Sequence, residues 1–329
     1  MTAKLNRRVI LSLAGGAAFF PLAARAASET HQRLGVAFGT QVRLALVGPP
    51  AAQAEEALDG CFRIIRSVEA AASLFRPDSE IIRLNSEGRL KNPSDDLRRL
   101  LVLSREMSVL TEGAWDPTVQ PLWRACDNAV KAGDWPSDAR IGALRENIDW
   151  RSIEITQDEI SFARRDMALT LNGIAQGYAA ERVAEFLRAR GVTDAFLDTG
   201  EIESMGRRAD GADWRAGLAD PRKPGAFIGV VSPFKGCLST SGDYACAWSP
   251  DFVRHHILDP ATGVSPPELA STCVIAPRGG VADALSTAVM IMGAEKGLAL
   301  VARLPGVEAL FISKQGAIAK TAGFPFTAV

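Results

Sequence analysis

The spacing of apolar positions changes along the chain, and each spacing predicts a different kind of element. Between residues 58 and 72 the apolar side chains recur mostly at steps of three and four residues, as on one helix face: Leu58, Cys61, Phe62, Ile65, Val68 and Ala72. Ser94 is expected to cap a second helix over about 95–110. Two further helices are predicted at about 174–190, ended by Gly191, and at about 282–304.

Shorter segments that alternate or run apolar predict strands. Residues 33–47 are expected to form one opening strand, and a hairpin that turns at Gln157-Asp158 is expected within 150–171. Further strands are predicted at 194–198, 214–218, 226–232, 253–258, 271–276 and 307–313. Residues 73–85 are predicted to be a loop, and two prolines prevent 113–123 from forming a plain helix or a central strand. Because helices and strands mix without strict alternation, the pattern predicts an α+β fold with mixed sheets and flanking helices.

The composition narrows the class of protein. The 329 residues are 47% hydrophobic and 23% charged, which is ordinary for a globular protein of one large or two moderate domains. A formal charge of −1 gives no reason to expect a nucleic acid or an anionic membrane as partner. The 5 cysteines include no zinc-type spacing, and their odd number means that they cannot all pair. Buried thiols are expected, with one unassigned disulfide left open.

The N-terminus has the layout of a secretory signal peptide. Lys4, Arg7 and Arg8 precede an apolar run from Val9 to Leu22, and Ala24-Arg25-Ala26 supplies a small-x-small cleavage site. The run is too short to span a bilayer, so no stable membrane span is expected. The sequence therefore predicts a signal peptide over 1–26, one domain over 27–329 and an exported, periplasmic protein. The arginine pair leaves the twin-arginine and the general export routes open.

The segment ADALSTAVMIMG, residues 282–293, gathers oxygen ligands on one helix face. Asp283 and Thr287 are four residues apart, with Ser286 beside them. One carboxylate with hydroxyl groups suits Mg²⁺, which needs few protein ligands because water and phosphate complete its octahedron. The other interpretation is structural: Asp283 would complement the helix dipole, and Thr287 would bond back to a carbonyl. The residues alone do not decide between the two.

Two further segments carry groups that suit chemistry at a ligand. In HHILDPATG, residues 255–263, a turn sequence follows an expected strand and would present His256 near a sheet end. STSGDYA, residues 239–245, gathers hydroxyl side chains and Asp243 around Gly242. It lacks the GxSxG spacing of a hydrolase nucleophile, so a contact with a polar ligand is favoured over a serine nucleophile.

The segment LNGIAQGYAAERV, residues 171–183, places Gly173 just before an expected helix. Free N–H groups and the positive end of the helix dipole favour an anion there. Gly177 allows a ligand or a neighbouring element to approach the helix closely. The chain contains neither GxGxxG nor GxxxxGK[ST], which excludes Rossmann and P-loop nucleotide sites.

Taken together and in this order, these motifs resemble those of the FAD:protein FMN transferases, the ApbE family. The resemblance covers about residues 33–315 and is carried by SLFRPDSEIIRLN, TEGAWDPTVQPLW, LNGIAQGYAAERVAEFL, STSGDYA, HHILDPATG and ADALSTAVMIMG. It implies an ApbE-like, T-fold-related architecture. It also implies transfer of FMN from FAD to a Ser or Thr hydroxyl of a partner flavoprotein, with Mg²⁺ bound and AMP released.

The resemblance also implies which residues act. The metal would be held by Asp283, Thr287 and the Gly173 carbonyl with Ser286 close by, and His256 would lie beside the reacting pyrophosphate, so that His256 and Asp283 are the catalytic pair. Eight residues occupy FAD-binding positions: Phe38, Phe75, Ala114, Trp115, Asp116, Thr170, Gln176 and Ile257.

Three departures from the family pattern leave alternatives open. Thr170 stands where the family has an acid, Gln176 stands where it has Lys or Glu, and its GGDI segment reads Thr199-Gly200-Glu201-Ile202. A Mg²⁺-dependent FAD pyrophosphatase would use the same site with water as acceptor, and an exported FAD-binding protein without turnover would need no metal. The sequence identifies neither the acceptor protein nor the oligomeric state.

Overall fold

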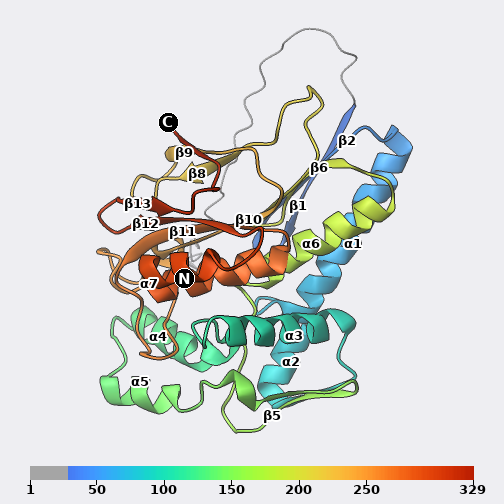
Figure 1. Ribbon diagram of the computed structural model, residues 1–329. Helices are drawn as coiled ribbons and strands as arrows, with labels where there is room; N and C mark the ends of the chain where they lie inside the picture. The colour runs from blue at the N-terminus through green and yellow to red at the C-terminus, as the bar shows by residue number, and fades with distance from the viewer. Residues whose placement is uncertain (1–28) are drawn as a thin grey trace, which may run out of the picture.

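A computed structural model describes residues 29–329 of the chain (Figure 1). The predicted signal peptide, residues 1–26, lies outside the described residues, so the domain boundary after residue 26 stays a prediction. The described part combines helices with three sheets, and the α+β fold expected from the sequence is confirmed.

The largest sheet has 8 strands, and every neighbouring pair is antiparallel. In spatial order the strands are β1 (Thr30–Ala37), β2 (Thr40–Val47), β6 (Asp194–Asp198), β7 (Ile202–Met205), β10 (Gly236–Gly242), β11 (Leu269–Ala276), β12 (Glu308–Ser313) and β13 (Ile318–Lys320). Two small sheets flank it: β14 (Phe326–Ala328), β9 (Phe227–Val231) and β8 (Ala216–Ala219) form one, and β3 (Arg89–Lys91), β5 (Glu159–Phe162) and β4 (Ile153–Ile155) form the other.

Helix α7 (Gly279–Val301) lies against β10 and β11, with α3 (Asp95–Leu110) on its opposite side (Figure 1). It is apolar around most of its circumference because both of these sides are buried. Within 29–329 it is the one helix long and apolar enough to cross a membrane by length and composition, and a core helix of a soluble protein passes the same test. Gly293, with φ 80°, breaks the helix, and the Glu268 carboxylate accepts a hydrogen bond from the Ala294 N–H just beyond it.

Helix α6 (Ala175–Ala189) packs between α7 and α1 (Ala51–Ala72), which covers β1 and β2. The remaining helices are α2 (Glu80–Glu87), α3 (Asp95–Leu110), α4 (Gln120–Lys131) and α5 (Asp138–Arg145), joined by short 3₁₀ turns at Pro117–Val119, Trp150–Ser152 and Asp243–Cys246. The α4–α5 pair packs on its own small core below α7 (Figure 1).

Several predicted elements are confirmed closely. The second helix spans Asp95–Leu110, and the Ser94 hydroxyl accepts the Leu97 N–H at 3.2 Å. The hairpin of β4 and β5 turns at residues 156–158, and β6 covers 194–198 as expected.

Three predictions from the pattern are wrong, and one strand was not predicted. Residues 33–47 form two strands rather than one, because Phe38 and Gly39 make a tight turn with φ of 52° and 75°. The expected loop 73–85 contains the start of α2, which the Ser79 hydroxyl caps. Residues 253–258 form no strand, only a single bridge between His255 and Ala247. Strand β10, which contains the first four residues of STSGDYA, was not predicted.

Candidate active site

The N-terminal end of α6 meets the first half of α7, and this contact assembles the predicted metal residues. The Asp283 carboxylate is 4% exposed and accepts the Gly177 N–H at 3.0 Å. A Cβ atom added at Gly173 would lie 3.0 Å from the Thr287 hydroxyl oxygen, so Gly173 and Thr287 are in contact. The structure therefore brings Gly173, Asp283 and Thr287 together from two segments far apart in sequence.

A third segment adds a hydroxyl that the sequence analysis did not single out. The Ser241 oxygen, near the end of β10, lies 2.8 Å from that of Ser286 and 3.1 Å from that of Thr287. Ser286 also donates to the Asp283 carbonyl at 2.8 Å. Three hydroxyl groups therefore cluster beside a buried carboxylate, and the motif STSGDYA contributes through its second serine.

The electrostatics of this cluster favour a cation. Burial raises the pKa of Asp283 to about 7. Burial and the neighbouring Asp283 carboxyl raise the pKa of Glu201 well above its usual range. Two buried carboxyl groups this close hold protons that a cation would displace. Glu201 comes from the turn after β6, and the Thr240 N–H donates to it at 3.2 Å.

The donor chemistry of the cluster fits Mg²⁺. Carboxylate, hydroxyl and carbonyl oxygens are hard ligands, and no cysteine or histidine takes part. Within residues 29–329 no group of three or more His, Cys, Asp or Glu side chains is arranged to hold a metal ion. Water and phosphate oxygens would therefore complete any octahedron around a cation held by Asp283, Thr287 and the Gly173 carbonyl.

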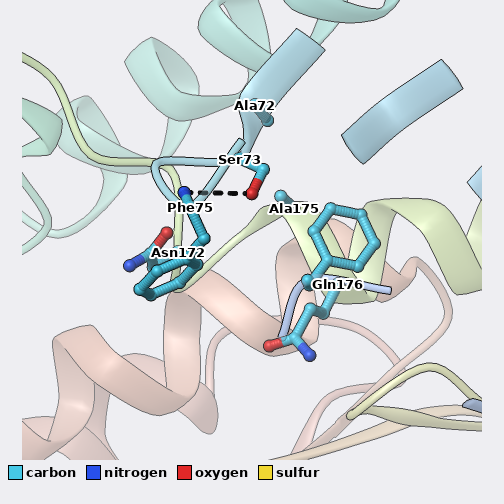
Figure 2. A pocket seen from close by; sticks show the side chains of 7 residues that line it. Ala72, Ser73, Phe75, Asn172, Ala175 and Gln176 are labelled. Carbon is cyan, nitrogen blue, oxygen red and sulfur yellow. Dashed lines mark hydrogen bonds between the residues drawn. The ribbon is translucent and has the colours of Figure 1, made fainter. Parts of the chain in front are cut away.

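An aromatic pocket borders the same segment that contains Gly173 and Gly177. Figure 2 shows its wall, which is lined by Phe38, Ala72, Ser73, Phe75, Asn172, Ala175 and Gln176. Three of these residues are predicted FAD contacts: Phe38, Phe75 and Gln176. Phe75 is 56% exposed, and aromatic rings of this kind can stack on a planar ligand. Residues 172–177 form a shared wall: Asn172, Ala175 and Gln176 line the pocket, while Gly173 and Gly177 contact Thr287 and Asp283.

Gln176 joins α6 to the turn that carries Glu201. Its side-chain amide donates to the Thr199 carbonyl at 2.9 Å, and the Thr199 hydroxyl donates to the Gln176 carbonyl at 2.9 Å. Gly200, with φ 104°, has no room for a Cβ atom because the Gln176 amide would lie 2.0 Å away. Gln176 therefore lines the pocket and at the same time fixes this turn against α6.

The two neighbouring histidines make different contacts. His255 is fully buried; its N–H donates to Ser265, and its Nε2 lies 3.3 Å from the Pro266 carbonyl. His256 is anchored through its N–H to the Cys246 carbonyl at 3.0 Å. Burial lowers the pKa of His256 to about 4, so the ring is neutral at pH 7, and its buried Nδ1 has no hydrogen-bond partner among the described residues. Nothing in 29–329 hydrogen-bonds the His256 ring to Asp283, Ser286 or Thr287.

The arrangement matches known proteins over nearly its whole length. The sequence pattern of the ApbE family matches residues 38–311. This chain belongs to the ApbE family. It is 28% identical to the FAD:protein FMN transferase of Treponema pallidum over 321 residues, covering 91% of this chain and 89% of the relative. It is 29% identical to that of Vibrio cholerae over 252 residues, covering 72% of this chain and 74% of the relative.

Solved ApbE structures share the fold. The flavin transferase ApbE of Vibrio cholerae aligns with a TM-score of 0.77 at 26% identity, covering 89% of this chain and 97% of that one. The apo form of the Pseudomonas stutzeri flavinyl transferase ApbE aligns with a TM-score of 0.77 at 30% identity, covering 90% of this chain and 95% of that one.

Among the remaining residues predicted from the ApbE resemblance, two have clear structural roles. Trp115 is buried and donates its indole N–H to Ser104 at 2.8 Å, while its ring edge lies against Gly173. The Asp116 carboxylate accepts hydrogen bonds from the N–H groups of Thr118 and Trp150, at 2.8 and 3.2 Å, which holds a 3₁₀ turn. Their contact with FAD stays a prediction.

The other three predicted FAD residues lie near this group. Ala114 and Ile257 pack on the same core cluster as Trp115. Thr170 donates its N–H to the Pro117 carbonyl at 2.8 Å and accepts the Asn172 N–H at 3.3 Å, so its hydroxyl supports the segment that leads to Gly173. Ala114, Ile257 and Thr170 have uncharged side chains, so they would contribute shape rather than charge to a binding site.

The Asp243 carboxylate, which the sequence places among the hydroxyls of STSGDYA, serves the fold. It is fully buried, and Arg222 binds both of its oxygens at 2.8 Å. Lys314 lies 3.8 Å from the same carboxylate. This ion pair fixes the end of β10 and leaves Ser241 as the member of the motif that faces the cluster.

Proposed function

We propose that this chain transfers FMN from FAD to a Ser or Thr hydroxyl of a partner protein, in a Mg²⁺-dependent reaction that releases AMP. The observation that carries the proposal is the shared wall of residues 172–177, which borders both the pocket of Phe38 and Phe75 and the cluster of Asp283 and Thr287. FAD has the same two parts, a flat ring system and a pyrophosphate. The names of the relatives support FAD as the donor and a protein as the acceptor.

The residues would divide the work as follows. Asp283, Thr287 and the Gly173 carbonyl would hold Mg²⁺, which neutralises charge on the pyrophosphate oxygens. The free N–H groups at the start of α6 would add positive potential toward the phosphates. The acceptor hydroxyl oxygen attacks the phosphorus of the FMN half, the P–O bond to AMP breaks, and a neutral His256 ring accepts the hydroxyl proton.

A single experiment tests this proposal. The chain is incubated with FAD, MgCl₂ and a candidate flavin-acceptor domain, and flavin fluorescence is followed through denaturing electrophoresis while AMP is measured. Label on the acceptor together with AMP is the expected result. FMN and AMP without label would identify a pyrophosphatase, and intact FAD would leave only a binding protein. Asp283→Ala should abolish turnover, while Asp210→Ala, in an exposed loop away from the cluster, should not change it.

We also propose that the protein is exported to the periplasm. The support is the order of charge, apolar run and small-residue site within residues 1–26. Cell fractionation and the N-terminal mass of the exported chain test this. Cleavage after Ala26 is the expected result, and a full-length protein confined to the cytoplasm would contradict it.

A further inference from the structure

The two ends of the large sheet are protected very differently. At one end β13 has 3 residues and finishes at Lys320, and a short strand with a lysine is a common way to prevent further strand pairing. At the other end β1 has 8 residues without proline or lysine, and its register with β2 is unbroken over 8 pairs. No described strand pairs with the outer edge of β1.

The turn that ends β1 determines which of its groups face outward. Ala37 and Thr40 flank a two-residue turn in which Phe38 and Gly39 both have positive φ. In a turn of this kind the two flanking residues, Ala37 and Thr40, form a hydrogen-bonded pair of the ladder. Because such pairs alternate along an antiparallel ladder, odd-numbered residues of β1 bond to β2 and even-numbered ones direct their N–H and C=O groups to the open edge. Gln32, Leu34 and Val36 therefore offer six backbone groups to another strand.

The side chains along this edge are unusual for exposed positions. Leu34 is 58% exposed and Val36 is 68% exposed, on the sheet face away from α1. The opposite face of β1 borders a groove along α1 that is lined by Arg33, Leu34, Gly35, Asp59, Phe62, Arg63 and Arg66. Arg33 is paired with Asp59 and Glu55, whereas Arg63 and Arg66 form no ion pair with the described residues. The groove therefore presents two positive charges, unpaired within the described residues, beside the Leu34–Ala37 half of β1.

The edge leads directly to the proposed flavin pocket. Phe38, the residue after β1, lines that pocket together with Phe75. With a rise of about 3.3 Å per residue, a strand paired along Gln32–Val36 would carry its next two to four residues about 7–13 Å further, to the pocket mouth. A Ser or Thr in that continuation would reach the flavin pocket, whose wall of residues 172–177 also borders the proposed pyrophosphate site.

We propose that the outer edge of β1 docks an extended segment of the acceptor protein as an added strand. This inference rests on the proposed transfer to a partner protein. The segment pairs with Gln32, Leu34 and Val36, places acidic side chains toward Arg63 and Arg66, and presents its Ser or Thr a few residues beyond the paired region. Backbone pairing supplies affinity in such complexes, and the alternate side chains supply specificity.

The test measures binding without FAD, so that it does not depend on transfer. Random twelve-residue peptides displayed on phage are selected on the immobilised chain, and the Kd of an enriched synthetic peptide is measured by fluorescence polarisation. Enriched peptides should be acidic and should alternate apolar with polar residues. Leu34→Lys combined with Val36→Lys should weaken binding at least tenfold. The matched control Ile318→Lys, 46% exposed on the opposite edge strand, should not change the Kd.

Other outcomes would overturn the docking proposal. The proposal fails if the selection yields no peptide. It also fails if the peptide binds the double lysine variant as tightly as the wild type while the two melting temperatures are the same. A wild-type dimer that the lysine variant converts to a monomer would show that a second copy occupies the edge instead. If peptides bind as expected but no acceptor is ever labelled from FAD, the proposed function fails and the docking surface stands.

Discussion

Gly177 of α6 and Gly279 of α7 face each other where the two helices cross, and neither position has room for a Cβ atom. One added at Gly177 would lie 2.1 Å from the Gly279 carbonyl oxygen, and one added at Gly279 would lie 2.0 Å from that of Gly177. This close approach allows the Gly177 N–H to reach the Asp283 carboxylate at 3.0 Å. The crossing of two helices thus sets the position of the predicted metal ligand.

Gly177→Ala should therefore lower both stability and activity. The methyl group meets backbone rather than a flexible side chain, so the helices must separate, at a cost of about 1–3 kcal/mol. For a domain of this size we expect a melting temperature lower by about 2–10 °C in calorimetry. Gly142→Ala is the matched control, because Gly142 lies in α5 with nothing within 4 Å of an added Cβ. A Gly177→Ala variant as stable and active as the control would contradict the packing argument.

Mg²⁺ binding should become stronger as the pH rises through neutrality. Burial raises the pKa of Asp283 to about 7, and Glu201 is raised in the same direction. Without metal, the folded protein therefore holds protons that the unfolded chain releases, so its stability falls as the pH rises from about 4 to about 7. The increase in melting temperature on adding Mg²⁺ should be larger at pH 8 than at pH 6.

Two variants refine the expected effect of pH. Glu201→Gln removes the neighbouring negative charge and should move the pH dependence of Mg²⁺ binding to lower pH. Asp283→Asn should remove the Mg²⁺-induced stabilisation altogether. A stabilisation in wild type that is the same at pH 6 and pH 8 would count against a carboxylate ligand with a raised pKa.

The two neighbouring histidines should differ in what their substitution costs. His256→Asn should slow FMN transfer by about 10²–10⁴-fold with FAD affinity unchanged, as expected when a proton acceptor is lost. His255→Asn should mainly lower the melting temperature, because His255 is fully buried and its ring bonds to the Pro266 carbonyl. Transfer rates and thermal melts of both variants separate the two roles, and the reverse pattern would exchange the assignments.

The sequence pattern predicted correctly those elements that are determined by neighbouring residues in the chain. The 95–110 helix was predicted to the residue because a capping serine and a regular apolar spacing agree there. Strand β10 was missed because GCLSTSG is small and polar, with none of the β-branched and aromatic runs that mark a strand. β10 forms because it pairs with β7 and β11 in the folded sheet, and these strands come from segments elsewhere in the sequence.

The site shows the same division between local and long-range causes. Gly173, Asp283 and Thr287 were predicted to act together because the motifs that carry them are recognisable in sequence. Glu201 was noted only as a departure from the family pattern, and Ser241 was not singled out. Both reach the cluster through sheet topology, since β10 lies between β7 and β11 and ends beside α7. No sequence spacing encodes that adjacency.

The position of Gln176 indicates a role in holding the turn at Thr199, in addition to the predicted contact with FAD. Its amide donates to the Thr199 carbonyl and so holds the turn that carries Glu201 near Asp283. Gln176→Ala should cost about 0.5–1.5 kcal/mol of stability through the lost hydrogen bond and should weaken Mg²⁺ binding together with FAD binding. Gln176→Glu should lower stability and Mg²⁺ binding more than Gln176→Ala does, because a carboxylate cannot donate to Thr199 and adds negative charge near Glu201.

Thermal melts and Mg²⁺ titrations measure the effects of both Gln176 variants, with the exposed Gln157→Ala as control. If Gln176→Ala weakens FAD binding alone and leaves the melting temperature and the Mg²⁺ titration unchanged, the side chain acts on the cofactor and not on the turn.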